Sequence, residues 1–118
     1  MHAIDEIYQI IGQNIFNTLS EVKWDKAIAD IEIQKNYVSF QGVYEYHGKQ
    51  KGFLDLDDDQ GFDVDLVSEV VEELNQAMSE NPINKWNKAK VTLSSEGDFD
   101  MEFFWDQEYQ DRVDSHSK

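Results

Sequence analysis

Residues 27–46, AIADIEIQKNYVSFQGVYEY, contain two runs in which apolar or small side chains recur at every second position. Successive side chains of a β-strand point to opposite faces, so each run predicts a strand with one apolar face. Lys35 and Asn36 separate the runs, which indicates a hairpin. The alternating positions are Ala27, Ala29, Ile31 and Ile33, and then Val38, Phe40, Gly42, Tyr44 and Tyr46.

The segment that follows, HGKQKGFLDL (47–56), predicts a turn at its first glycine and then a third strand. In that strand we expect Leu54 and Leu56 to face the core. Phe53 and Asp55 then face the other side.

Two segments have the apolar spacing of amphipathic helices. The first covers about residues 3–19, and the second begins after an N-cap at Asp63 and ends before Pro82. Phe62 is expected to pack on Val67 as a hydrophobic staple at the start of the second helix. The predicted buried stripes are Ile4, Ile7, Tyr8, Ile11, Ile15 and Leu19 in the first helix, and Val67, Val70, Val71, Leu74, Ala77 and Met78 in the second.

A last hairpin is predicted in KWNKAKVTLSSEGDFDMEFFWD (85–106), with its turn at residues 94–98. The order of helix, three strands, helix and two strands predicts an α+β fold, with an antiparallel sheet of about five strands and helices on one face. We expect one domain over residues 1–106. Residues 107–118 have no apolar period and predict a mobile C-terminal tail.

Composition limits the classes of partner. The chain has 118 residues, 40% of them hydrophobic, with 25 acidic and 10 basic residues and a net charge of −15. Phosphate binding depends on clustered Lys and Arg, so nucleic acid and anionic membranes are poor partners and a basic protein is the natural one. An acidic surface that only maintains solubility is the alternative.

Other features point to the cytoplasm. The chain has no cysteine, and the acidic N-terminus MHAIDEIYQI does not resemble a signal peptide. No apolar run approaches the roughly 18 residues that a membrane span needs.

The acidic stretch GFLDLDDDQGFDVD (52–65) has some features of a calcium loop. An EF-hand loop needs a glycine at its sixth position and a carboxylate at its twelfth. Counting from Asp55, these positions are Gln60 and Leu66, and counting from Asp57 fails in the same way. We therefore predict no specific metal site and no cofactor, and a weak divalent-cation site remains an alternative.

The histidines give no support for catalysis. His2 and His116 are near the termini and His47 is in a predicted turn, so none is placed beside a plausible nucleophile and acid. We expect a binding protein and not an enzyme.

The sequence resembles the YezG/EsaG family of immunity proteins over about residues 1–106. The segments that carry the resemblance are EVKWDKAIADIEI (21–33), DVDLVSEVVEELNQAM (63–78) and NKWNKAKVTLSSEGDFDMEFFWD (84–106). The resemblance implies a cytoplasmic antitoxin that neutralises a cognate secreted or contact-delivered toxin, commonly a nuclease.

The expected toxin-binding residues are acidic, because a nuclease presents Lys and Arg to phosphates. Trp105, at the exposed end of the last strand, is the aromatic candidate for this interface, whereas Trp24 and Trp86 are expected to be structural anchors that keep each indole N–H near a partner. Asp63 and Asp65 are expected to act partly as capping residues. The first acidic set is Asp57, Asp58, Asp59, Glu69, Glu72 and Glu73, and the second is Asp98, Asp100, Glu102 and Asp106.

Overall fold

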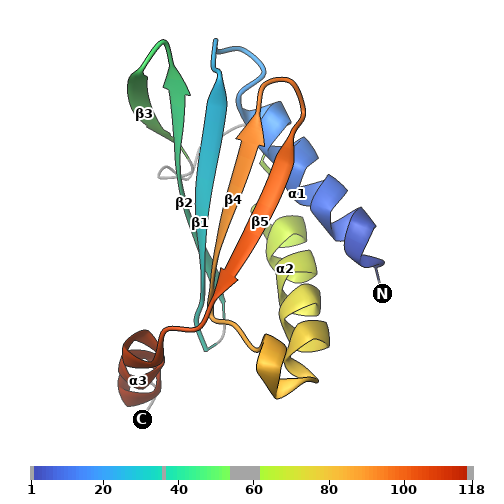
Figure 1. Cartoon of the computed structure of the whole chain (residues 1–118), viewed down its shortest axis with the longest axis vertical. Coiled ribbons are helices and arrows are strands. Elements are labelled where there is room, and N and C mark those ends of the chain that lie inside the picture. The colour runs from blue at the N-terminus through green and yellow to red at the C-terminus, as the bar shows by residue number, and fades with distance from the viewer. Residues whose placement is uncertain (1, 36, 54–61, 117–118) are drawn as a thin grey trace.

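The computed structural model describes residues 2–35, 37–53 and 62–116, which form an α+β fold built on one antiparallel sheet (Figure 1). The five strands lie in the order β3-β2-β1-β4-β5. The strands are β1 (Lys26–Ile33), β2 (Val38–Tyr46), β3 (Lys49–Phe53), β4 (Lys88–Ser94) and β5 (Phe99–Phe104). The helices are α1 (Ile4–Thr18), α2 (Val64–Ser79), the short 3₁₀ helix η1 (Pro82–Asn84) and α3 (Gln107–His116).

The predicted helix and strand order and the fold class are confirmed, with α3 and η1 as additions. The first hairpin aligns as its alternation predicts, since Ile31 opposes Phe40 and Ile33 opposes Val38. Within the described ranges, none of the helices combines the length and the apolar character that crossing a bilayer requires.

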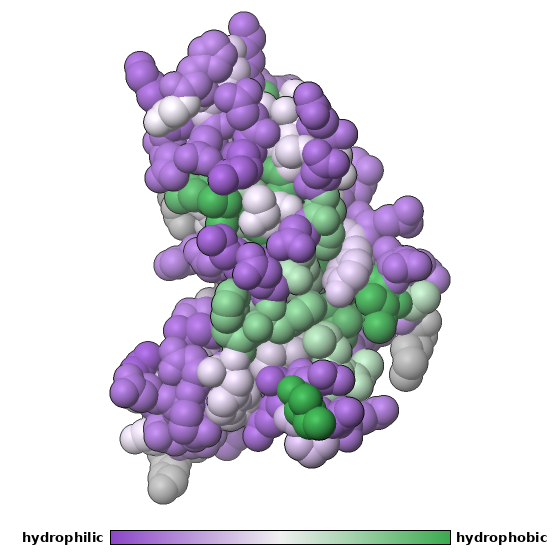
Figure 2. Space-filling view, in the orientation of Figure 1, coloured by the Kyte–Doolittle hydropathy of each residue, from purple (hydrophilic) through white to green (hydrophobic). Residues whose placement is uncertain are grey.

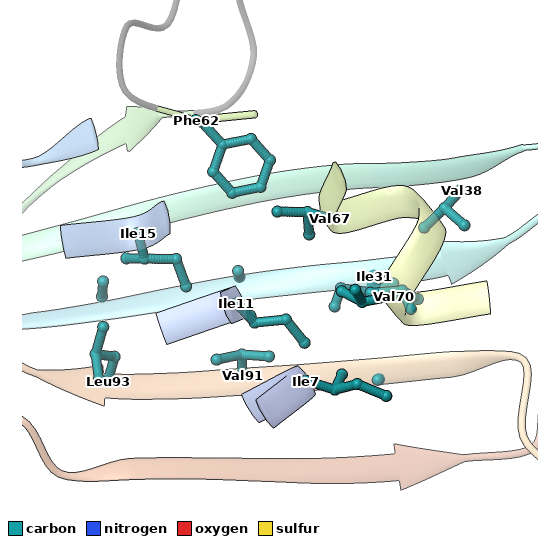
Figure 3. Packing of buried hydrophobic residues seen from close by; sticks show 14 of the residues in the cluster. Ile7, Ile11, Ile15, Ile31, Val38, Phe62, Val67, Val70, Val91 and Leu93 are labelled. Carbon is teal, nitrogen blue, oxygen red and sulfur yellow. The ribbon is translucent and has the colours of Figure 1, made fainter. Parts of the chain in front are cut away.

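Helices α1 and α2 pack on one face of the sheet (Figures 1 and 3). Ile7, Ile11 and Ile15 of α1 and Val67 and Val70 of α2 are each at most 2% exposed. Of the predicted stripes, Tyr8 and Met78 are partly buried, whereas Ala77 is exposed and Ile4 keeps half of its surface in solvent. Ile4 is the first residue of α1, and Ala77 lies in the last turn of α2.

The start of α2 confirms the predicted cap. The Asp63 carboxylate accepts a hydrogen bond from the Leu66 backbone N–H at 3.0 Å, and Phe62 is buried edge-on against Phe40. The buried Asn14 of α1 accepts a further bond from the Asp63 backbone N–H at 2.8 Å. The first turn of α2 is therefore attached directly to α1.

The predicted facing of Phe53 is wrong. The two-residue turn at His47 and Gly48, where both φ angles are positive, sets a register in which Phe53 opposes Gly42. Directly opposed residues share a face, so Phe53 lies on the helix-covered side and is 5% exposed. Gly42 leaves room for the ring, because a Cβ there would be 2.6 Å from Phe53 Cε1. The predicted core positions Leu54 and Leu56 lie outside the described residues.

The expectation of a mobile tail over residues 107–118 is also wrong for residues 107–116, which form α3. The Asp106 carboxylate caps this helix by accepting from the Tyr109 backbone N–H at 3.0 Å. Tyr109 is 7% exposed, and its hydroxyl donates to the Ile33 carbonyl at 3.1 Å. A single buried aromatic residue attaches the helix, so no apolar period appears in its sequence.

The buried Asn87 fixes the chain where β5 continues into α3. Its side-chain amide donates to the Asp106 carbonyl and accepts from the Asp106 N–H, both at 2.9 Å. It is 1% exposed, so it is one of two buried polar side chains among the described residues, the other being Asn14.

Two of the three tryptophans pack within the fold. Trp86 is 2% exposed and packs on Phe103, as a structural anchor should, but its indole N–H has no partner among the described residues, contrary to expectation. Trp24 is half-buried and lies edge-on to Phe16 at a centroid distance of 5.3 Å.

Candidate functional site

The predicted acidic residues of α2 differ in their availability. Glu69 and Glu72 are exposed and make no ion pair within the described part of the chain. Glu73 is half-buried and accepts hydrogen bonds from the His2 backbone N–H at 3.2 Å and from the His2 imidazole at 2.9 Å. These bonds lower the pKa of the Glu73 carboxyl below its usual value. Asp57, Asp58 and Asp59 lie outside the described residues.

The acids of the last hairpin also divide into two kinds. Asp100 and Glu102 are exposed on β5, Glu102 lies across from Lys90 of β4, and neither acid forms an ion pair in the described ranges. Asp98 belongs to the β4–β5 turn, where its backbone N–H donates to the Ser94 hydroxyl at 3.0 Å.

The Asp106 carboxylate is already occupied within the fold. It caps α3 and pairs with Lys88 at 3.2 Å. The hydrogen bond from Tyr109, followed by that from Lys88, lowers the pKa of the Asp106 carboxyl. Asp106 therefore holds α3 in place and is a poorer candidate for contact with a partner.

The arrangement of charge is the clearest feature of the surface. Helices α1 and α2 and strand β5 contain no lysine or arginine, whereas the described basic residues lie in β1, β3, β4, the connections and α3. We call the acids of these three elements the acidic surface. They are Asp5, Glu6, Asp65, Glu69, Glu72, Glu73, Asp100 and Glu102.

Contacts near the N-terminal end of α1 join the chain there to α2 and to β5. At its N-terminal end, His2 holds Glu73 of α2, while Tyr8 packs on Phe99 of β5 at a centroid distance of 5.3 Å. Burial raises the pKa of the Tyr8 hydroxyl, and the nearby charges of Asp5 and Asp100 raise this pKa further. Asp5 of α1 and Asp100 of the edge strand β5 therefore both lie near Tyr8, although Asp100 and Glu102 project from the face of the sheet that the helices leave open.

Three apolar side chains are exposed in η1 and where β5 ends. Phe104 is 46% exposed, Trp105 is 38% exposed and Ile83 of η1 is 89% exposed. We call these three residues the aromatic ledge. Figure 2 shows a band of hydrophobic surface across the molecule at the level where β5 ends.

Two polar contacts hold Trp105 in position. The Lys85 ammonium lies 4.3 Å from the centroid of its indole ring, and the indole N–H donates to the Gln107 side chain at 3.0 Å. The sequence analysis singled out Trp105 but missed Phe104 and Ile83. The exposure of one of these aromatic rings could have been predicted from the run Phe103–Phe104–Trp105. Consecutive strand residues face opposite sides, so one aromatic ring of the run must face away from the core.

The described residues contain no cluster of His, Asp and Glu side chains that could hold a metal ion. Residues 54–61, which hold most of the acidic stretch that was compared with a calcium loop, lie outside the described ranges. His2 is bonded to Glu73, and His47 stacks on Tyr46 in the β2–β3 turn at a centroid distance of 4.0 Å. The arrangement described here is one of surface charge and exposed apolar groups, which is the chemistry of protein association.

No protein-family model matches the chain, and no curated protein matches it.

Proposed function

We propose that the protein is an immunity protein that acts in the cytoplasm by binding and neutralising a basic toxin domain, with a nuclease as the toxin class. The observation that carries the proposal is the absence of lysine and arginine from α1, α2 and β5, three elements that together present eight acids. The resemblance of the sequence to the YezG/EsaG family supplies the class of partner.

Electrostatics explains how such a surface would act. A nuclease must present Lys and Arg to phosphate groups, so a surface of carboxylates is complementary to the nuclease. Such a surface would block the site where the nuclease binds nucleic acid. Opposite net charges also steer the two proteins together, which raises the association rate at low ionic strength.

The aromatic ledge gives the proposed interface its apolar part. Aromatic side chains are enriched among the residues that dominate binding energy, and charged rims contribute more to association rate than to residence time. Trp105 is pre-positioned by Lys85 and Gln107, so little side-chain entropy is lost when a partner covers it.

The proposal is tested by co-purification with the toxin domain encoded beside the gene, followed by a nuclease assay and stopped-flow association kinetics. We expect stoichiometric inhibition. The variant Glu69→Lys/Glu72→Lys should associate about tenfold more slowly at low ionic strength. The matched control is Glu21→Lys/Glu108→Lys, which makes the same change of net charge at exposed acids on other elements.

The results separate the proposal from its alternatives. Trp105→Ala should mainly accelerate dissociation, since it removes an apolar contact and no charge. Equal slowing by both charge variants would assign the acids to a general effect of net charge, as expected for a solubility role. Absence of binding to the neighbouring toxin domain would refute the proposal outright.

A further inference from the structure

A basic hollow is lined by residues of β2, β3 and the connection before β1. The β2–β3 hairpin lies at the top of Figure 1. Its volume is about 450 Å³, within the range of pockets that hold small molecules. It is lined by Val22, Lys23, Tyr44, Tyr46, Lys49 and Lys51, and none of these is acidic.

The hollow is built from two cross-strand pairs. Tyr44 opposes Lys51 and Tyr46 opposes Lys49, so all four side chains project from the same face of the sheet. The connection before β1 supplies the wall, with Val22 and Lys23. Because α1 ends at Thr18 and α2 packs on other parts of this face, two half-buried tyrosine rings remain beside three exposed ammonium groups.

The lysines of the hollow are not neutralised by ion pairs with described residues. None of Lys23, Lys49 and Lys51 forms an ion pair with a described residue, whereas Lys26 and Lys88 both do. In a chain of net charge −15 that has 10 basic residues, three such groups around one hollow are a marked local reversal of sign.

The acids nearest to these lysines in the sequence mostly have other hydrogen-bond or ion-pair partners in the described chain. The Asp25 carboxylate accepts from the His47 backbone N–H at 3.0 Å, and the Glu45 carboxylate binds Lys26 and Gln50. The hydrogen bond from Gln50, together with the charge and hydrogen bond of Lys26, lowers the pKa of the Glu45 carboxyl, whereas desolvation and the nearby Asp25 oppose this shift. Glu21 is exposed and is the one nearby acid that we find without an assigned contact in the described chain.

We propose that the basic hollow binds a nucleotide, with its phosphate groups on Lys23, Lys49 and Lys51 and its base against Tyr44 and Tyr46. Lysine ammonium groups bind phosphate as point charges, and the face of an aromatic ring accepts any base by stacking. The volume of the hollow and its combination of aromatic and cationic side chains both fit a nucleotide, which has an aromatic base and phosphate groups.

The ligand is a free nucleotide and not a nucleic-acid strand. The molecule is 42 Å long, and charges separated by more than about 10 Å are largely screened at physiological salt. A small anion in the hollow therefore experiences mainly the local lysines. A strand that continued beyond it would meet the acidic remainder of the surface, which repels phosphate. The hollow and the acidic surface are separate, so either binding activity can fail while the other persists.

The test is an NMR titration of the full chain with ADP, begun at physiological salt, where the distant acids are screened. We expect amide shifts confined to residues 22–24 and 44–51 and saturable binding that weakens as salt is added. The double variant Lys49→Gln/Lys51→Gln should weaken ADP binding at least fivefold. The matched control, Lys35→Gln/Lys85→Gln, removes the same charge at exposed lysines at the other end of the sheet and should change it less than twofold.

Further ligands distinguish the sources of the phosphate. Pyrophosphate should cause smaller shifts at Tyr44 and Tyr46 than ADP does, because it has no base to stack. A short oligothymidylate should bind more weakly than ADP. Tighter binding of the oligonucleotide, equal losses in the two lysine variants, or absence of ADP shifts in the folded wild-type protein would each overturn the proposal. A dimer that forms through Lys49 and Lys51 would overturn it as well, since it would assign the hollow to a second copy of the chain.

Discussion

Substitution of Asn87 by alanine is the sharpest test of how the C-terminal helix is held. The change removes the side-chain bonds to the Asp106 N–H and carbonyl, both of 2.9 Å, and a longer bond of 3.4 Å to Gln110. The backbone bonds of residue 87, which join it to Phe104 and Ile33, do not depend on its side chain.

The expected loss of stability follows from the polar groups that the substitution leaves without a hydrogen-bond partner. A lost bond whose groups keep other partners costs about 1 kcal/mol, and a buried group left without a partner costs about 1–3 kcal/mol. The Asp106 carbonyl keeps the bond from the Gln110 backbone N–H at 3.1 Å, whereas the Asp106 N–H is left without a partner, so we expect Asn87→Ala to lower the free energy of unfolding by about 3 kcal/mol. That is a large part of the roughly 5–15 kcal/mol that stabilises a domain of this kind.

Urea denaturation followed by tryptophan fluorescence measures this loss. With a slope of about 1–3 kcal/mol per molar urea, the midpoint should fall by about 1–3 M. Hydrogen exchange should show that amides of α3 lose protection before those of α2, because Asp106 both caps α3 and contacts Asn87. Gln110→Ala, which removes the long bond and an exposed bond from Gln110 to Asp114, serves as the control and should leave the midpoint nearly unchanged.

Two outcomes would contradict this account. A midpoint shift no larger than that of the Gln110→Ala control would show that Asn87 is not the residue that fixes the junction. Equal loss of protection in α2 and α3 would show that α3 does not separate as a local unit.

Three further predictions concern positions described above. Gly42→Ala should destabilise the fold by about 2 kcal/mol, because the new Cβ would overlap the buried Phe53 ring, and thermal unfolding would show the loss; an unchanged melting temperature would mean that the ring moves freely. Asp63→Ala should cost about 1 kcal/mol through loss of the α2 cap, measured by denaturation, with toxin association unchanged. The lowered pKa of Glu73 means that its bonds to His2 stabilise the fold above its ordinary value of 4.5 and lose this effect as the pH falls through the lowered pKa. Glu73→Gln should therefore flatten the decline of stability with acid, and an unaltered pH profile of the melting temperature would refute the assignment.

Sequence reasoning succeeded where the signal was local. The alternation in residues 27–46 predicts a hairpin because side-chain period and burial depend on neighbouring residues alone. The Asp63 cap was predictable for the same reason, since its hydrogen bond spans three residues.

The errors occurred where structure depends on distant residues. The facing of Phe53 depends on the register set by the preceding turn, and a shift of one residue reverses every side chain of a strand. Helix α3 depends on Asn87, which is 19 residues from Asp106 in the chain, and on the Ile33 carbonyl, which is 76 residues from Tyr109. No periodicity within residues 107–116 could reveal partners of that kind.

The candidate site was predicted in part. Acid-rich segments were visible in the sequence, but the contacts of His2 with Glu73 and of Tyr8 with Phe99, which join the start of the chain and α1 to α2 and to β5, are a property of packing. The roles of Asp98 and Asp106 within a turn and a helix cap likewise required the fold.

The strand order has a consequence for how copies of the protein meet. The sheet has a basic edge, with Lys49 and Lys51 on β3, and an acidic edge, with Asp100 and Glu102 on β5. Opposite edges of two molecules attract each other at a distance, and a sheet extended in this way would be a head-to-tail polymer that never closes.

The faces on which the edge residues lie disfavour that polymer once two edges touch. The lysines project from the face that the helices cover, where Lys51 opposes Tyr44, whereas Asp100 opposes Thr92 and so projects from the open face. If β3 of one molecule joined β5 of another in a continuous sheet, the lysines and the acids would emerge on opposite sides of the seam. Each charged group would then be desolvated without forming an ion pair. The facing of these residues therefore disfavours the growth of fibres through edges of opposite charge.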